Sequence, residues 1–304
     1  MQSKLWQPLK PGDTVDLVAP ASRFDQGRLE RLSKLLADWG LKLNIPADIF
    51  GDDILCANSD AKRFELLKDA LYNSASKAII CGRGGYGSMR LIPLLATLKP
   101  PTTVKLFIGM SDITALHIFF QQQWGWATLH AAPIPGVFAD SSIELVRQIV
   151  LGEKTKVVFD QLTPLNKAAQ YSQTIDSVVV GGNLTLIETG LGTLWQLNPD
   201  NKILFLEETG ERAYKVDRKL EHLRQAGLLN KVKAIIFGDF TKGEEPNGTS
   251  LIEPVLRRFA ESLTVPVLQQ AGIGHDPHND PLPLNAPASL DLGAKAKLAI
   301  SISA

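Results

Sequence analysis

Residues 104–120, VKLFIGMSDITALHIFF, contain the pattern that decides the fold of this chain. The apolar run 104–108 predicts a buried strand, and helix-compatible apolar residues resume at Ile113. Ser111 lies at the sharp turn between them, where the free N–H groups of the following helix are close by. A serine at such a turn is placed to act as a nucleophile. It is equally compatible with a helix N-cap, as is Asp112.

The first half of the chain alternates between short apolar runs and amphipathic segments, which predicts a parallel sheet with helices on both faces. In such sheets the ligand crevice lies at the carboxyl ends of the strands. Two loops at strand ends, 82–87 and 109–112, are therefore expected to face one cleft, and Ser22 is expected to cap the first helix. The expected strands are 14–19, 41–45, 78–81 and 104–108, and the expected helices include 29–39 and 61–72.

The second half repeats the alternation after a more polar, weakly patterned stretch at 142–173. Strands are expected at 177–180, 203–206 and 234–238, and a helix at 215–226. We therefore predict an α/β protein with an N-terminal domain at 1–150, a linker at 151–174 and a C-terminal domain at 175–304.

The composition is that of a soluble globular protein without a net charge that would attract a charged partner. Of 304 residues, 44% are hydrophobic and 21% charged, and Lys plus Arg equals Asp plus Glu, so neither nucleic acid nor an anionic membrane is an expected partner. No apolar run has the length of a membrane span, the start lacks the apolar run of a signal peptide, and a cytoplasmic location is the default. Cys56, Cys81 and five scattered histidines match no disulfide framework or metal site, so no metal is expected.

The glycine-rich loop 82–87, GRGGYG, follows the third expected strand. Its spacing matches a dinucleotide fingerprint, but that fingerprint belongs after the first strand and needs a ribose-binding acid about 20 residues on. A tight turn with positive φ is one alternative. The other is an oxyanion hole, because glycine N–H groups can point at a developing negative charge.

A candidate acid and a candidate base follow in the second half. Glu207 ends the apolar run 203–206, with Glu208 and Glu211 as competitors; strand alternation allows only one of Glu207 and Glu208 to face a given histidine.

The candidate base is His275, which lies in the loop sequence GIGHD, and His278 is its competitor. His117, in the helix after Ser111, is expected to be packed or partly exposed. Ser111, Glu207 and His275 would supply nucleophile, acid and base in the chain order also found in α/β-hydrolases. Ile113 stands where the GxSxG elbow of those enzymes has its second glycine, so an ordinary α/β-hydrolase is not expected.

Six segments together resemble the LD-carboxypeptidase family of serine peptidases over nearly the whole chain. They are LKPGDTVDLVAPAS, GRGGYGSMRLIPLL, FIGMSDITALH, GGNLTLIETGLGT, LFLEETGERAYKVDRKLEHLRQAGLL and GIGHDPHNDPLPL. The resemblance implies a flavodoxin-like N-terminal domain, a smaller mixed α/β C-terminal domain, a site between them and a homodimer. It assigns the catalytic triad to Ser111, Glu207 and His275 and the oxyanion hole to the N–H groups of Gly85 and Asp112.

The implied reaction removes the terminal D-alanine from cytoplasmic murein tetrapeptide through an acyl-enzyme, without a cofactor. Arg83 and Arg90 flank the glycine loop and are the candidates for binding the substrate carboxylate, although Arg90 is equally compatible with a solvent-exposed helix position. Two other functions stay open. One is a related serine amidase that acts on a peptide-nucleotide antibiotic for self-immunity, and the other is a binding module without catalysis.

Overall fold

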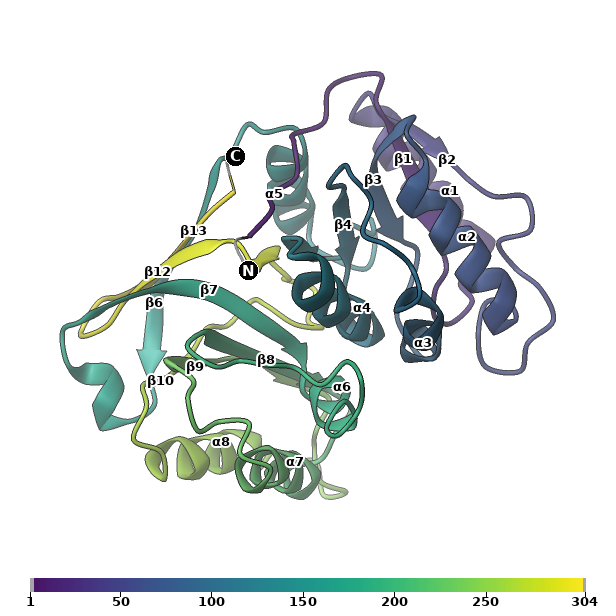
Figure 1. The fold of residues 1–304 in the computed structure, drawn as a ribbon. Coiled ribbons are helices and arrows are strands. Elements are labelled where there is room, and N and C mark those ends of the chain that lie inside the picture. Colours follow the sequence, from purple (N-terminus) through teal and green to yellow (C-terminus); the bar gives the residue numbers. More distant parts are fainter. Residues whose placement is uncertain (1–2, 303–304) are drawn as a thin grey trace.

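Parallel strands form the sheet of the N-terminal domain in the computed structural model, which describes residues 3–302 (Figure 1). The spatial order β2-β1-β3-β4-β5 is that of flavodoxin-like proteins, and β11 extends the sheet as an antiparallel edge strand. The predicted flavodoxin-like domain is therefore confirmed. The strands are β2 (Lys42–Asn44), β1 (Thr14–Val18), β3 (Ser76–Cys81), β4 (Leu106–Gly109), β5 (Thr128–His130) and β11 (Leu282–Leu284).

Helices cover both faces of this sheet because its strands are apolar on both sides. Ile80 of β3 packs into the core with α1 and α5, whereas its neighbour Ile79 packs into the core with α2 and α4. The helices are α1 (Gln26–Asp38), α2 (Asp60–Tyr72), α3 (Ile92–Leu95), α4 (Thr114–Phe119) and α5 (Asp140–Val150). Among the residues described, no helix has the length and apolarity required to cross a membrane.

The cap of α1 differs from the prediction. Asp25, not Ser22, is its N-cap residue, and the Asp25 carboxylate accepts a hydrogen bond from the N–H of Arg28 at 2.7 Å. The Ser22 hydroxyl instead donates to the carbonyl of Leu55 and accepts from the N–H of Tyr86, at 3.2 and 3.1 Å. Ser22 therefore contributes to the glycine loop rather than to the helix.

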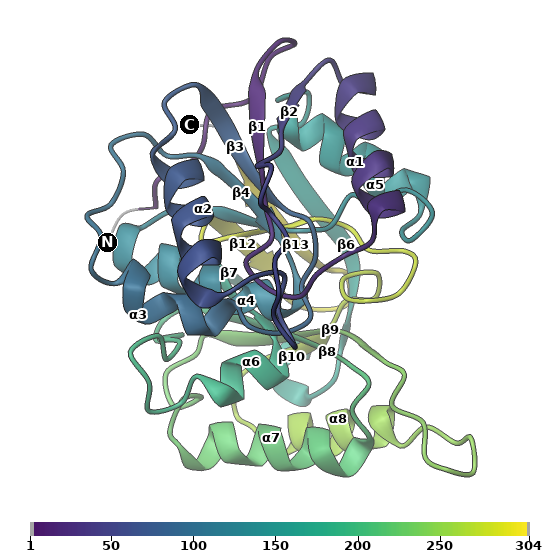
Figure 2. The same ribbon diagram turned by 90° about the vertical axis from the view of Figure 1, so that its right-hand side faces the viewer.

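The C-terminal domain is a closed barrel with strand order β10-β6-β13-β12-β7-β8-β9. Its strands β7, β8 and β9 are parallel and carry helices α6, α7 and α8, which lie together on the outer side (Figure 2). This matches the expected mixed α/β domain. The elements are β6 (Lys156–Pro164), β7 (Thr174–Asn183), α6 (Leu184–Thr189), β8 (Ile203–Thr209), α7 (Ala213–Gln225), β9 (Ala234–Thr241), α8 (Ile252–Glu261), β10 (Val267–Gln269), β12 (Pro287–Asp291) and β13 (Ala296–Ser301).

The predicted linker at 151–174 differs from the structure, because 156–164 form β6 inside the barrel. Val157 and Phe159 are buried in the core while Val158 between them is 40% exposed, so the segment alternates as a strand does. The domain boundary is crossed again near the end of the chain, where β11 leaves the barrel to join the sheet of the N-terminal domain.

Candidate active site

Ser111 lies at the point where β4 turns into a helix. After β4, the one-turn helix η2 (Ser111–Ile113) leads directly into α4. Ser111 has a φ of 64°, in the left-handed region that a residue with a side chain rarely adopts, which holds its hydroxyl on the outside of a strained turn. Within residues 3–302 no side chain caps η2, so the N-cap interpretation of Ser111 has no support in the geometry.

Asp112 does not cap the helix either. Its carboxylate accepts from the N–H of Ser88 at 2.8 Å, and its carbonyl accepts from the Ser88 hydroxyl at 2.6 Å. Ser88 begins the short helix η1 (Ser88–Leu91), which follows the glycine loop. Asp112 thus fastens the glycine loop to the serine turn. As a residue of the first helical turn it also has a backbone N–H without a partner inside the helix.

The glycine loop contacts the serine turn closely. A Cβ atom on Gly84 would lie 2.9 Å from both the Cβ of Ser111 and the carbonyl of Met110, closer than side chains allow. Gly85 has a φ of 101°, so it also occupies a conformation that favours glycine. The loop therefore needs these glycines to pass beside Ser111.

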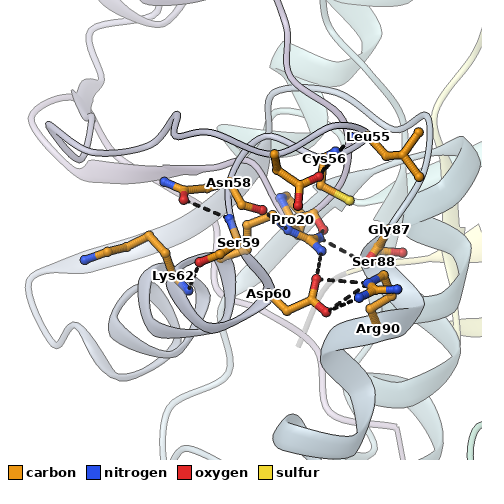
Figure 3. A network of polar contacts seen from close by, with 12 residues as sticks. Pro20, Leu55, Cys56, Asn58, Ser59, Asp60, Lys62, Gly87, Ser88 and Arg90 are labelled. Carbon is orange, nitrogen blue, oxygen red and sulfur yellow. Dashed lines mark hydrogen bonds and ion pairs between the residues drawn. The ribbon is translucent and has the colours of Figure 1, made fainter.

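Buried Arg63 on α2 holds the far end of this loop. It belongs to a network of polar contacts of which Asp60, Gly87 and Arg90 are labelled in Figure 3. Its guanidinium donates to the carbonyls of Pro20, Gly87 and Asn58, the last two both at 3.0 Å. Asp60 accepts from Arg63 at 2.5 Å and pairs with Arg90 at 2.6 Å. Arg90 therefore belongs to this supporting network, and the structure does not bring it to the cavity between the two domains.

The candidate acid and the candidate base meet, and His275 lines the same cavity as Ser111. His275 Nδ1 lies 2.7 Å from Glu207 Oε2, and Glu207 is fully buried. Glu208 points to the other face of β8, where it accepts hydrogen bonds from Asn183 and Thr185 at 3.1 and 2.9 Å. The geometry thus distinguishes the two glutamates that the sequence leaves open.

The environment of His275 favours its protonated form. Burial lowers the pKa of His275, but the charge and hydrogen bond of Glu207 act in the opposite direction, and the pKa is raised overall. The competitor His278 lies elsewhere and is 56% exposed beside Asp280. His117 is fully buried, with its Nε2 2.9 Å from the carbonyl of Gly109. Burial lowers the pKa of His117 to about 4, so its ring is neutral.

The loop that carries His275 is fixed by buried polar groups. The side-chain oxygen of Asn279 accepts from the N–H of Gly274 at 3.0 Å, and its amide nitrogen lies 3.3 Å from the sulfur of Met110. Asp239 at the end of β9 accepts from the N–H of Gly272 at 3.1 Å. Because Met110 precedes Ser111, these contacts connect the histidine loop directly to the serine turn.

A cavity of about 380 Å³ between the two domains contains both Ser111 and His275 in its lining. Three cations also line it, Arg28, Arg83 and Lys242, and no carboxylate lines it among the residues described. The side chains that line the cavity therefore give it a positive electrostatic potential, which favours negatively charged groups. No cluster of His, Cys, Asp or Glu within 3–302 is arranged to hold a metal ion.

Arg28 and Lys242 were not predicted from the sequence. Arg28 lies on an amphipathic helix, where an arginine normally contacts solvent, and Lys242 lies in a loop of mixed charge. Burial, and next the charge of Arg83, lower the pKa of the Arg28 guanidinium. Arg28 reaches the cavity because α1 runs beside the glycine loop, where Arg28 donates to the carbonyl of Gly82 at 3.3 Å. The sequence alone does not show this path.

Comparison with known proteins identifies relatives along the whole chain. A putative carboxypeptidase of Rickettsia conorii is 40% identical over 95% of this chain and 91% of its own length. The murein tetrapeptide carboxypeptidase of Pseudomonas aeruginosa is 26% identical over 94% and 95%. The microcin C7 self-immunity protein of Escherichia coli is 25% identical over 95% and 93%.

A solved structure shares the fold. The muramoyltetrapeptide carboxypeptidase of Oxalobacter formigenes has a TM-score of 0.81 at 24% identity, over 95% of this chain and 98% of that one. Residues 15–131 match the LD-carboxypeptidase N-terminal domain and 176–290 the LD-carboxypeptidase C-terminal domain. The chain therefore belongs to the LD-carboxypeptidase family, as its motifs predicted.

Proposed function

We propose that this protein is a serine-type LD-carboxypeptidase that removes the terminal D-alanine from murein tetrapeptide. One observation carries the proposal: a histidine held by a buried glutamate at 2.7 Å faces the same cavity as a serine at a strained strand-to-helix turn. That arrangement is the one required for nucleophilic acyl transfer. The name of the Pseudomonas aeruginosa relative supports murein tetrapeptide as the substrate.

In the proposed mechanism, Ser111 Oγ attacks the carbonyl of the amide that joins the L-centre of the diamino acid to D-alanine. His275 Nε2 takes the serine proton, while Glu207 accepts from Nδ1–H and holds the ring in the required tautomer. The N–H groups of Gly85 and Asp112 bind the tetrahedral oxyanion. His275 then gives its proton to the leaving amine, and D-alanine departs. Water next attacks the acyl-enzyme while His275 takes a proton from the water, and His275 returns that proton to Ser111 Oγ as the acyl group is released.

The cations of the cavity support a substrate with free carboxylates. We propose that Arg83, with Arg28 and Lys242, binds carboxylates of the peptide, because all three line the cavity and none faces an acidic residue of its lining. Replacing Arg83 or Arg28 by Met should raise KM for the tetrapeptide about 10-fold or more. Arg31→Met, an exposed arginine on the same helix, is the matched control and should leave KM unchanged.

The test is mass spectrometry of purified protein incubated with murein tetrapeptide, beside the Ser111→Ala variant. Loss of one D-alanine with the wild type alone supports the proposal. If neither protein cleaves it, a peptidyl-nucleotide substrate tests the self-immunity alternative, for which Phe138 in the cavity lining is the available aromatic ring. Binding of either ligand by both proteins without cleavage would indicate a binding module.

The proposed setting is the cytoplasm, where murein peptides are recycled, and the proposed assembly is a homodimer. Both cysteines are free thiols, which suits a reducing compartment. The family resemblance supports the dimer. Light scattering of the purified protein measures the mass in solution, and a mass near that of one chain would contradict the dimer.

A further inference from the structure

Behind the proposed triad, His130 lies at the end of β5 and its ring reaches across the domain interface toward the acid. Its Nε2 lies 3.9 Å from Glu207 Oε1, the carboxylate oxygen that is not hydrogen-bonded to His275. Both residues are fully buried. Within the described residues neither nitrogen of His130 nor Oε1 of Glu207 has a hydrogen-bond partner.

Two unpartnered polar atoms that face each other in the buried interior are each costly, and a bond between them would remove both costs. We infer that His130 is a positioning residue: its neutral ring carries the proton on Nε2 and donates it to Glu207 Oε1, which fixes the carboxylate that orients His275. The gap has to close by about 1 Å to reach a normal hydrogen-bond length. This inference rests on the proposed role of Glu207.

The surroundings of His130 keep it uncharged, so it donates one hydrogen without competing for the proton of the triad. Burial, and next the nearby His117 and His275, lower the pKa of His130 to about 3. With the proton on Nδ1 instead, the lone pair of Nε2 would face the lone pairs of the carboxylate, which is repulsive. The Nε2–H tautomer is therefore the stable one beside an ionised Glu207.

His130 and Glu207 lie in different domains, so a bond between them would connect the two domains beside the candidate nucleophile. His130 is paired in register with Gly109 of β4, two residues before Ser111. Glu207 belongs to the barrel, at the end of β8. A bond from His130 to Glu207 would therefore tie the orienting acid of one domain to the strand that carries the nucleophile in the other.

The kinetic test compares His130→Phe, His130→Gln and the control Thr128→Val. The phenylalanine ring fills the space without a donor, glutamine restores an N–H, and Thr128 is a buried polar residue on the same face of β5. Loss of a bond to a charged group predicts a fall in kcat of about 10- to 100-fold for His130→Phe, with KM changed less than about threefold. His130→Gln should recover most of that loss, and Thr128→Val should show none of it.

The pH profile separates positioning from packing. Without its second donor, the Glu207 carboxylate directs more of its negative charge toward His275 and stabilises the protonated ring more strongly. The charges of Glu208 and Lys242 also affect the pKa of His275, but they are unchanged in the variants. The acid limb of the kcat/KM profile should therefore move to higher pH in His130→Phe and return to its wild-type position in His130→Gln. Equal losses in both variants with no movement of the limb would overturn the inference.

A measurement without substrate keeps the inference testable if the proposed function fails or if a variant does not fold. Nitrogen-15 chemical shifts of histidine-labelled wild type report the tautomer of each of the five histidines, and the His130→Gln spectrum identifies the His130 signals. A neutral Nε2–H tautomer across neutral pH supports the inference. An Nδ1–H tautomer overturns it, whatever the enzyme cleaves.

Discussion

Replacing Glu207 by Gln exchanges one carboxylate oxygen for an NH₂ group at constant volume in a fully buried place. In the wild type, Oε2 lies 2.7 Å from His275 Nδ1, and Oε1 faces His130 Nε2 at 3.9 Å. If His130 donates, the amide oxygen has to face His130 and the NH₂ group has to face His275. His275 Nδ1 then becomes an acceptor, and the ring proton moves to Nε2, the atom that accepts the proton of Ser111 in the proposed mechanism.

The expected loss follows from that wrong tautomer. In Ser-His-Asp enzymes the corresponding change of acid to amide lowers kcat about 10⁴-fold, which is about 5.4 kcal/mol in the activation barrier at 1.36 kcal/mol per tenfold. The pH profile changes as well. Because Glu207 raises the pKa of His275 above its ordinary 6.5, wild-type kcat/KM should fall with acid at a pH above that value, and any residual activity of Glu207→Gln should hold to lower pH.

D-Alanine release, measured across pH for the wild type and two variants, provides the assay. Glu208→Gln is the matched control, since it makes the same chemical change one residue along and leaves the pair of His275 and Glu207 intact. We expect it to keep kcat within about tenfold while it weakens the bonds to Asn183 and Thr185. A Glu207→Gln enzyme that retains more than about a tenth of wild-type kcat would refute the assignment of the acid.

Three further changes test other parts of the site. Ser111→Gly and Ser111→Ala should both be inactive. The glycine variant should unfold in denaturant with a free energy about 1 kcal/mol higher than that of the alanine variant, because only glycine adopts a φ of 64° without strain. Equal stabilities of the two variants would contradict a strained turn. Gly84→Ala should lower kcat about 10²-fold, since its new methyl lies 2.9 Å from the Cβ of Ser111 and must displace it; unchanged kinetics would show that the turn yields freely. Arg63→Met should lower the free energy of unfolding by about 2–4 kcal/mol because three backbone carbonyls lose their donor. Arg90→Met removes a half-exposed ion pair and should lower the free energy of unfolding by less than about 1 kcal/mol. A larger loss of thermal stability in Arg90→Met than in Arg63→Met would contradict the role of Arg63.

The sequence is sufficient wherever the determining pattern is local. The turn at Ser111 follows from an apolar strand that meets a helix within a few residues, and the alternating order of elements follows from their separate periodicities. For Glu207 and Glu208, alternation shows only that they face opposite sides of β8. Which side holds His275 depends on how the barrel closes, and no local pattern encodes that closure.

Long-range pairing explains the remaining differences. The strand β6 pairs with β13 and β10, more than 100 residues away, so its sequence alone has the weak pattern of a linker. Arg90 is close to the glycine loop in sequence, but Asp60 on another helix binds it. Arg28 reaches the cavity through the path of α1, which depends on the packing of the whole sheet.

The pairing of β11 with β5 constrains how a substrate can enter. Residues 270–281, which carry His275, leave the barrel at β10 and are fastened at their other end to the neighbouring domain, where Leu282 pairs with His130 and Leu284 with Thr128. A hinge that parted the two domains would have to break these pairs or drag the histidine away from Glu207. The pairing therefore favours substrate entry through movement of side chains and loops that line the cavity, such as the loop that carries Val137 and Phe138, over a change in the angle between the domains.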